Sequence, residues 1–340
     1  MLVLTRTEVE ALLDPDALVD ALAVAHAELS AGRTSLPPRV AAFAGDDGLL
    51  GAMPAYLPGA GLGCKLVSVF PHNRELPSHQ ALIALFDAAT GAPVALLDGT
   101  HITATRTAAA AALAARLLAR PDARVLAILG TGVQARSHFG AFAGIRDWAE
   151  IRIAGRDAAK AAALAGGLGA VAAASFEEAV RGADVVAATT HAAEPVVRAE
   201  WVEPGAHVGS VGFAARAGRV TGKAGGARLE DRAPEAPSEG FELDRALVEA
   251  ADVLAVEARD SAFSTGPAGA PELAGIDPQR AVELGELVAG TRPGRTSPQQ
   301  RTVYKSVGIA VQDLAAAALV LAAARERGAG REIELEEISA

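Results

Sequence analysis

The sequence predicts an α/β protein in which an antiparallel sheet precedes a doubly wound parallel sheet. Two observations carry this prediction. Residues 49–98 hold four short apolar runs separated by glycine, proline and asparagine, which is typical of an antiparallel meander. Between residues 125 and 256, strand-length apolar runs alternate with helical stretches, and this alternation is typical of a parallel sheet covered by helices.

Composition bounds the class of protein. A chain of 340 residues suffices for two domains, and 51% hydrophobic with 21% charged residues is typical of a globular protein. The net charge of −10 argues against nucleic acid or an anionic membrane as the main partner. The single cysteine, Cys64, excludes an internal disulfide framework and a multi-cysteine metal site. The first residues carry charges where a signal peptide needs an apolar core, so we expect a cytoplasmic protein.

The first part of the chain reads as a helix followed by the meander. Apolar spacing over residues 8–31 predicts one helix that stops at Gly32, and Pro37-Pro38 then imposes an extended approach to the sheet. A long helix over Ile102–Ala119 follows the meander. The expected strands are 49–57, 62–70, 80–87 and 93–98.

The stretch Arg124–Ala135, RVLAILGTGVQA, combines a strand, a glycine turn and a helix start. The turn Gly130-Thr131-Gly132-Val133-Gln134-Ala135 has the pattern G-x-G-x-x-A, and the helix continues to about Ala143. Gly130 permits the tight turn and Gly132 lets the backbone approach a pyrophosphate, which the helix N-terminus attracts. This context predicts a dinucleotide-binding (Rossmann-type) fold.

The rest of the parallel sheet follows from the same pattern. Residues 214–240 are rich in glycine, proline and charge, which predicts a long surface loop. The strongly apolar run from Val303 to about Arg325 predicts a buried helix. The expected strands are 125–129, 150–154, 170–173, 184–188, 207–211 and 253–256.

The end of the second Rossmann strand bears on cofactor choice. An acid there binds the ribose hydroxyls of NAD, whereas an arginine favours the additional phosphate of NADP. Ile151–Ala154 is followed by Gly155-Arg156-Asp157, so no acid stands at the immediate strand end. We therefore expect NADP(H) to be favoured, although Asp157 can still reach a ribose and NAD(H) stays possible.

Three cations stand in unusual places. Strand alternation puts Lys65 on an apolar face with Val67 and Val69, which indicates either a task for this lysine or an edge strand that it protects. Arg106 lies in the first turns of a helix, where the helix dipole disfavours a cation, so we expect it to contact an anion from the protein or from a ligand. Arg39, after the double proline, is a second rigidly placed guanidinium that could grip a carboxylate.

The sequence gives little support for a catalytic histidine, a metal site or a nucleophile motif. His79, after Ser78, is a lone histidine, and lone histidines are more often structural. His101, His191 and His207 show no metal-ligand spacing, so we expect no metal. The sequence contains neither a G-x-S-x-G nucleophile elbow nor a P-loop.

Seven segments in order along nearly the whole chain resemble the ornithine cyclodeaminase/mu-crystallin family, closest to its ketimine-reductase members. They are GCKLVSV, PSHQALIALFDAATG, LLDGTHITATRTAAAAALAARLLA, ILGTGVQARSH, EPVVRAEWVEPGAHVGSVG, FELD and TVYKSVGIAVQDLAAA. The resemblance implies a homodimer, with a substrate-binding and dimerisation domain of residues 1–117 plus 303–340 around a Rossmann NAD(P)-binding domain of residues 118–302.

The resemblance also implies residue roles. Lys65, Arg39 and Arg106 would face the substrate, with Ser78 and His79 beside them, and residues 130–134 with Arg156 would hold the cofactor. One departure bears on the reaction. Cyclodeaminases carry an aspartate two residues after the glycine of their VGAD segment, whereas this chain reads Val211-Gly212-Phe213-Ala214. Asp231 or Glu235 could substitute for it, but nothing in the sequence shows this.

These observations predict an NADPH-dependent reductase of a small 2-imino acid or cyclic ketimine, with Lys65 and Arg106 as catalytic residues. Two alternatives stay open. One is an NAD-dependent ornithine cyclodeaminase or amino-acid dehydrogenase. The other is a non-catalytic protein that binds NADP(H) or another ligand.

Overall fold

The computed structural model describes residues 1–45, 47–212, 241–264 and 269–334. Within these residues the chain forms two compact units. Unit 1 is built from residues 1–106 and 309–334, and unit 2 from residues 107–212 and 241–308. The expected loop over residues 214–240 lies outside the described residues. No helix of the described part of the chain is long and apolar enough to cross a membrane.

Unit 1 contains a seven-stranded sheet in the order β15-β1-β6-β5-β4-β3-β2. Its core is the predicted antiparallel meander, whose four strands match the expected ranges to within one residue. Short β1 adds to β6 in parallel and pairs with β15, which makes the sheet mixed. The strands are β1 (Leu2–Leu4), β2 (Val40–Ala44), β3 (Gly48–Leu57), β4 (Gly61–Val69), β5 (His79–Phe86), β6 (Pro93–Asp98) and β15 (Arg331–Glu332).

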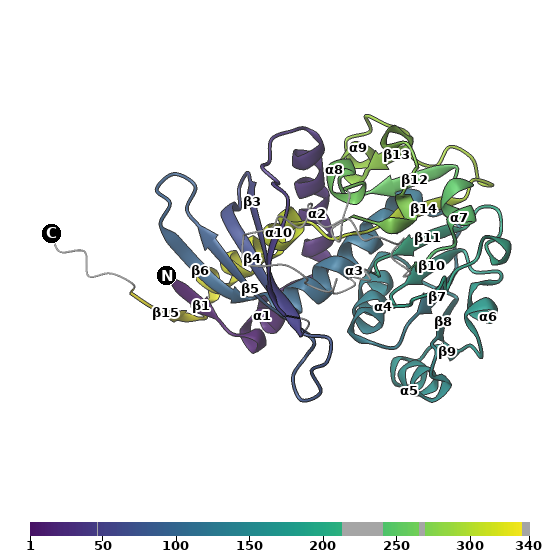
Figure 1. Ribbon diagram of the computed structural model, residues 1–340, viewed down its shortest axis with the longest axis horizontal. Coiled ribbons are helices and arrows are strands. Elements are labelled where there is room, and N and C mark those ends of the chain that lie inside the picture. The colour runs from purple at the N-terminus through teal and green to yellow at the C-terminus, as the bar shows by residue number, and fades with distance from the viewer. Residues whose placement is uncertain (46, 213–240, 265–268, 335–340) are drawn as a thin grey trace. The chain divides into compact units, whose positions relative to one another are not determined.

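Helices cover one face of this sheet. Helix α10 (Ala310–Arg327) packs against α2 (Pro15–Ser30) and against β3, β4 and β5 (Figure 1). The single helix expected over residues 8–31 is wrong, because α1 (Arg6–Leu12) ends before α2 begins. Asp14 caps α2 by accepting hydrogen bonds from the backbone N–H groups of Asp16 and Ala17, and Pro15 occupies the first helical position. Proline cannot continue a preceding helix, which explains the break.

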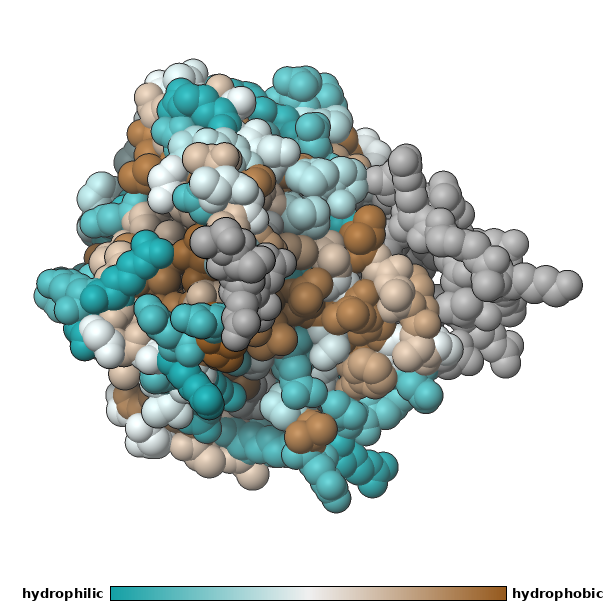
Figure 2. Space-filling view, turned by 90° about the vertical axis from the view of Figure 1, so that its left-hand side faces the viewer, coloured by the Kyte–Doolittle hydropathy of each residue, from teal (hydrophilic) through white to brown (hydrophobic). Residues whose placement is uncertain are grey.

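The opposite, outer face of the unit 1 sheet carries exposed apolar side chains. Strand alternation sends Met53, Ile83 and Leu97 into the core, and their neighbours point outwards. Five large apolar residues of this outer face are between 37% and 51% exposed, namely Val40, Leu50, Leu62, Leu66 and Leu82. Figure 2, seen from the side of β1 and β6, shows hydrophobic surface in the middle of the view.

Unit 2 contains an eight-stranded, all-parallel sheet in the order β13-β12-β14-β11-β10-β7-β8-β9. The strand order reverses between β7 and β10, which is the topological switch point of a doubly wound sheet. The strands are β7 (Val125–Leu129), β8 (Glu150–Ala154), β9 (Val171–Ala172), β10 (Val185–Ala188), β11 (His207–Ser210), β12 (Val253–Val256), β13 (Ala281–Glu283) and β14 (Thr302–Lys305).

Helices cover both faces of this sheet and form two apolar cores. Three short helices lie on one face: α6 (Phe176–Val180), α7 (Arg245–Glu249) and α8 (Arg259–Ala262). The other face is covered by the second half of α3 (Gly99–Leu118) with α4 (Val133–Ile145), α5 (Ala158–Leu168) and α9 (Leu284–Val288). The predicted doubly wound α/β architecture is therefore confirmed.

The predicted helix from Val303 is wrong in its first residues. Thr302–Lys305 forms β14 between β11 and β12, and α10 begins only at Ala310, after Gly308 with a φ of +70°. Lys305, Ser306 and Gly308 separate the strand from the helix, and the predicted helix extends across these boundary residues. The two compact units meet along the chain at residues 106/107 and 308/309.

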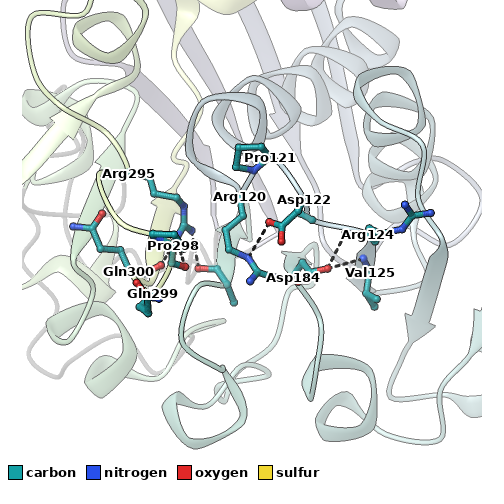
Figure 3. Close-up of polar contacts among 12 residues, drawn as sticks. Arg120, Pro121, Asp122, Arg124, Val125, Asp184, Arg295, Pro298, Gln299 and Gln300 are labelled. Atoms are coloured by element: carbon teal, nitrogen blue, oxygen red, sulfur yellow. Dashed lines mark hydrogen bonds and ion pairs between the residues drawn. The ribbon is translucent and has the colours of Figure 1, made fainter.

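Charged side chains fix the amino edge of the unit 2 sheet (Figure 3). Asp184 accepts hydrogen bonds from the backbone N–H groups of Arg124, at 2.7 Å, and Val125, at 3.0 Å, and it pairs with the Arg120 guanidinium. Arg295 donates to backbone carbonyls of neighbouring loops, including that of Gln300. This edge thus joins β7 and β10 through one carboxylate.

Candidate active site

Unit 1 buries two cationic side chains against one carboxylate. Lys65 of β4 is 2% exposed, Arg106 of α3 is 4% exposed, and Asp313 in the first turn of α10 is fully buried. Lys65 Nζ lies 2.8 Å from Asp313 Oδ2, and Arg106 Nε donates to Asp313 Oδ1 at 2.9 Å. The packing of α10 on β4 therefore brings residues far apart in the sequence into one ionic cluster.

Two further buried side chains extend this cluster. Arg106 Nη1 donates to Gln312 Oε1 at 2.8 Å, and Gln312 Nε2 lies 3.1 Å from His26 Nε2 on α2. Consecutive residues of α10, Gln312 and Asp313, thus orient the Arg106 guanidinium from two directions. A guanidinium held by two acceptors keeps a fixed orientation, which suits recognition of a planar anion.

The environment changes the acidity of the cluster. Burial lowers the pKa of Lys65 to about 8; the Asp313 carboxylate opposes this shift, and the charges of Arg106 and Arg39 add to it. Burial disfavours ionisation of Asp313, but the adjacent Arg106 and Lys65 outweigh it and lower the pKa of the carboxyl. Lys65 therefore releases its proton far more readily than an exposed lysine.

The structure bears on the alternatives left open for Lys65 and Arg106. Strand β4 lies between β3 and β5, so the interpretation of Lys65 as an edge-strand residue is wrong. The anion expected opposite Arg106 is a protein carboxylate, Asp313. Arg39 is half-buried and close enough for its charge to lower the pKa of Lys65.

Ser78 and His79 lie at the start of β5. His79 is exposed, Ser78 is half-buried, and Ser78 Oγ lies 3.3 Å from His79 Nδ1. His79 pairs with Val69, on the same face of the sheet as Lys65 but four residues along β4. At ~3.4 Å per residue that separation is about 14 Å.

The glycine turn of unit 2 has the predicted local geometry. Gly130 has a φ of +132°, and a Cβ there would lie 2.5 Å from Thr189 Oγ1, so only glycine fits. Gly132 precedes α4 without a side-chain cap, and a Cβ there would meet nothing within 4 Å. A Cβ on Gly155 would lie 2.6 Å from Thr131 Cγ2, which keeps the end of β8 close to the turn.

This turn fits the phosphates of a dinucleotide. The first turn of α4 contains no acidic residue, and its Val133 side chain is 65% exposed. The uncapped N–H groups at this helix start are therefore available to an anion. Gln134 Oε1 is buried and finds no hydrogen-bond partner among the described residues, which leaves one acceptor for a ligand.

Arg156 and Asp157 follow β8, at the position that contacts the ribose in doubly wound folds. Arg156 is exposed, and no ion pair joins it to a described residue. Asp157 caps α5, because its Oδ1 accepts hydrogen bonds from the backbone N–H groups of Ala159 and Lys160, each at 3.1 Å. The Asp157 carboxylate is thus already engaged by its own helix.

Sequence reasoning missed Asp313, the residue that holds the cluster together. The available signal was an acid in an apolar helix, since Asp313 is the one charged residue between Ala310 and Ala324. Ala214, Asp231 and Glu235 lie outside the described residues. Within the described residues, no group of three histidine, cysteine or acidic side chains could hold a metal ion.

Comparison with known proteins gives consistent matches over the whole chain. The model of the Ornithine cyclodeaminase/mu-crystallin family matches residues 1–221 and 225–328. The ketimine reductase mu-crystallin of Mus musculus is 40% identical over 279 residues, which is 80% of each chain.

Two solved structures share the fold over nearly their full length. The Δ1-pyrroline-2-carboxylate reductase of Thermococcus litoralis, in complex with NADH and L-proline, is 31% identical with a TM-score of 0.85, over 98% of this chain and 100% of that one. An archaeal alanine dehydrogenase dimer with bound NAD is 31% identical with a TM-score of 0.84, over 99% of each chain.

Proposed function

The chain belongs to the ornithine cyclodeaminase/mu-crystallin family and is an oxidoreductase, and on this premise we propose that it reduces the C=N bond of a small 2-imino acid or cyclic ketimine with NADPH. The observation that carries the proposal is the buried cluster of Lys65, Arg106 and Asp313. Its chemistry suits a substrate that combines a carboxylate with a basic nitrogen.

The charge balance of the cluster favours an anionic substrate. Two cationic side chains, Lys65 and Arg106, share the single carboxylate of Asp313, and the charge of Arg39 also acts on Lys65. Lys65, Arg106 and Asp313 together are therefore net positive, and a substrate carboxylate would complete the cluster. Arg106 and Arg39 grip that carboxylate, since a guanidinium can bind it through two parallel hydrogen bonds.

Lys65 has the acidity of a proton donor. Reduction adds a hydride to the imine carbon and a proton to the nitrogen, so the C=N bond becomes a CH–NH bond. The bound dinucleotide supplies the hydride. With a pKa of about 8, Lys65 carries a proton at neutral pH and can hold the imine in its protonated, more electrophilic form.

Arg156 supports NADPH over NADH. Its exposed guanidinium follows β8, where a 2′-phosphate would lie, and the Asp157 carboxylate that could favour a free ribose caps α5 instead. The two solved relatives hold NADH and NAD, so this preference is a property proposed for this chain and not taken from them.

Two other functions are less well supported. A cyclodeaminase needs an acid at the VGAD segment, and the sequence has Ala214 there. A non-catalytic binding protein has no use for a buried lysine whose pKa is lowered to about 8, because a carboxylate can be bound by arginines alone.

One panel of assays separates these functions. Purified protein should consume NADPH with cyclic ketimine acids, or with pyruvate plus an amine. With NAD and ornithine it should release no ammonia at an appreciable rate. Steady ammonia release from ornithine without net NADH formation would favour the cyclodeaminase, and binding of NADPH without turnover of any imine would favour the binding protein.

We also propose that the protein is a homodimer that pairs through the outer face of the unit 1 sheet. Val40, Leu50, Leu62, Leu66 and Leu82 expose large apolar side chains on that face. Monomers rarely expose contiguous apolar surface of this kind. The archaeal alanine dehydrogenase of the same fold is a dimer, which supports a dimeric state for this chain.

A further inference from the structure

A second buried carboxylate, Glu242, joins the carboxyl ends of two neighbouring strands in unit 2. Glu242 is 2% exposed and follows residues 213–240 in the sequence. One carboxylate oxygen accepts from the backbone N–H of Thr190 and from Thr190 Oγ1, the latter at 2.7 Å. The other accepts from Ser210 Oγ at 2.8 Å and from the backbone N–H of Gly212 at 2.6 Å. Thr190 follows β10, and Ser210 ends β11.

Two further charged residues support the same loops. Lys305, at the end of β14, donates to Ser210 Oγ and to the carbonyl of Gly212, both at 2.9 Å, and pairs with Glu272 Oε1 at 2.9 Å. Glu272 also accepts from the backbone N–H of Glu242 at 3.3 Å. A Cβ on Gly212 would overlap the Glu242 carboxyl group and the Thr190 carbonyl, so this packing requires glycine.

Such a network of buried charges contributes little net stability to a protein. Three buried charges lose their hydration, and apolar side chains of similar volume often stabilise a core equally well. What the network provides is fixed geometry, because Glu242 alone receives four hydrogen bonds from two loops. A geometric requirement at this place therefore explains it better than stability does.

The location of the Glu242 network in the sheet indicates which part of a ligand it positions. In doubly wound sheets a dinucleotide crosses the carboxyl edge at the switch point, here between β7 and β10. The glycine turn after β7 and Arg156 after β8 suit the pyrophosphate and the adenosine half. The other half must then extend over the ends of β10 and β11, where Thr190, Ser210 and Gly212 lie.

We propose that Glu242 is a positioning residue for the nicotinamide half of the dinucleotide. It holds the backbone after β10 and β11 in the arrangement that this half contacts, and Lys305 with Glu272 holds Glu242 and Gly212 in turn. The proposal rests on the proposed function, because it assumes that unit 2 binds NADP(H).

The opposite edge of the same sheet offers a matched control. Asp184 likewise joins two strands through backbone N–H groups, but at the amino ends of β7 and β10, where no ligand is expected (Figure 3). Replacement of either carboxylate by an amide puts a donor in the place of an acceptor. Both changes should lower the melting temperature, and only the change at Glu242 should affect the nicotinamide half.

The experiment compares the affinities of two nucleotides by calorimetric titration. The probes are NADPH and 2′-phospho-ADP-ribose, which lacks the nicotinamide. We expect Glu242→Gln to weaken NADPH binding about tenfold or more while the fragment stays within about twofold. Thr190→Val, which removes one donor to Glu242, should shift the same ratio by about threefold. Asp184→Asn should leave the ratio unchanged.

The possible outcomes distinguish failure of the positioning role from failure of the proposed function. If Glu242→Gln weakens both nucleotides equally, or neither, Glu242 has no positioning role, although the proposed function stands. If the parent protein binds neither nucleotide, the proposed function fails and this proposal fails with it. Should Glu242→Gln not fold, Thr190→Val decides, and an unchanged ratio in that variant would overturn the proposal.

Discussion

At the scale of single residues, unit 1 depends on a balance of buried charges. Lys65 and Arg106 each need an anion, because the effective penalty for burying an ion is several kcal/mol. Asp313 supplies that anion to both and is itself stabilised by them. Removal of Asp313 would therefore leave both buried cations without their shared counter-ion.

Substitution of the two cations should affect different kinetic constants. We expect Arg106→Met to raise KM for the imino acid about tenfold or more, because it removes a charge-assisted contact to the carboxylate. Lys65→Met should chiefly lower kcat, because the imine loses its proton donor. Steady-state kinetics with a preformed cyclic ketimine measures both, and Lys160→Met, an exposed lysine of α5, is the control. Full turnover by Lys65→Met would show that this lysine is only structural.

Asp313 should set the pH dependence of the reaction. Lys65 must be protonated to act, so kcat should fall as pH rises through about 8. The Asp313 charge raises the pKa of Lys65, so Asp313→Asn should lower that pKa and shift the alkaline limb to lower pH by about one unit or more. A pH–rate profile of both proteins tests this. An alkaline limb that stays in place would mean that another group titrates there.

Only some of the candidate site residues could be predicted from the sequence, and the reason is physical. Lys65 and Arg106 each stand where their own element disfavours a cation, and that conflict is visible in the local sequence. Asp313 does not conflict with its own helix, since an acid in the first turn is favourable, and its one signal is that the rest of the helix up to Ala324 is uncharged. Its role depends on the packing of α10 against β4, which local patterns do not encode. The same holds for Glu242, whose carboxylate accepts hydrogen bonds from residues at the ends of two separate strands, β10 and β11.

At the scale of elements, the predictions succeed where a strand is bounded by turns. Val125–Leu129, Glu150–Ala154 and Val253–Val256 have the expected ends, because glycine, proline or polar residues delimit each apolar run. They fail at β14 and α10, where the predicted helix extends across the boundary residues Lys305, Ser306 and Gly308. The short strand β13 is also missed, because three residues carry too little pattern.

The turn between β8 and α5 should determine cofactor preference. NADPH should bind more tightly than NADH, and Arg156→Ala should remove most of the difference, about tenfold or more, because a charge-assisted hydrogen bond to the 2′-phosphate is lost. Titration of protein fluorescence with each nucleotide measures this. Arg245→Ala, an exposed arginine of α7 paired with Glu249, is the matched control. Equal affinities for both nucleotides in the parent protein would contradict the prediction.

At the scale of the whole molecule, the outer face of unit 1 should govern assembly. Leu66→Glu places a charge in the middle of that face, and we expect the proposed dimer to dissociate because the buried carboxylate would lack a partner. Sedimentation velocity over a range of concentrations measures the effect. Val171→Glu, on β9 of unit 2, adds the same charge at an exposed apolar position outside the face. A monomeric parent protein would refute the assembly.

The division of unit 1 between both ends of the chain has a consequence for biosynthesis. The ribosome makes Lys65 and Arg106 first, then all of unit 2, and only then Asp313. At ~5–20 residues per second this interval lasts roughly ten to forty seconds. During it, unit 2 can fold as an intact segment, while the nascent sheet of unit 1 lacks both α10 and the counter-ion of its two cations. Ribosome-bound chains that stop before Asp313 are therefore expected to present a folded unit 2 beside a protease-sensitive N-terminal segment.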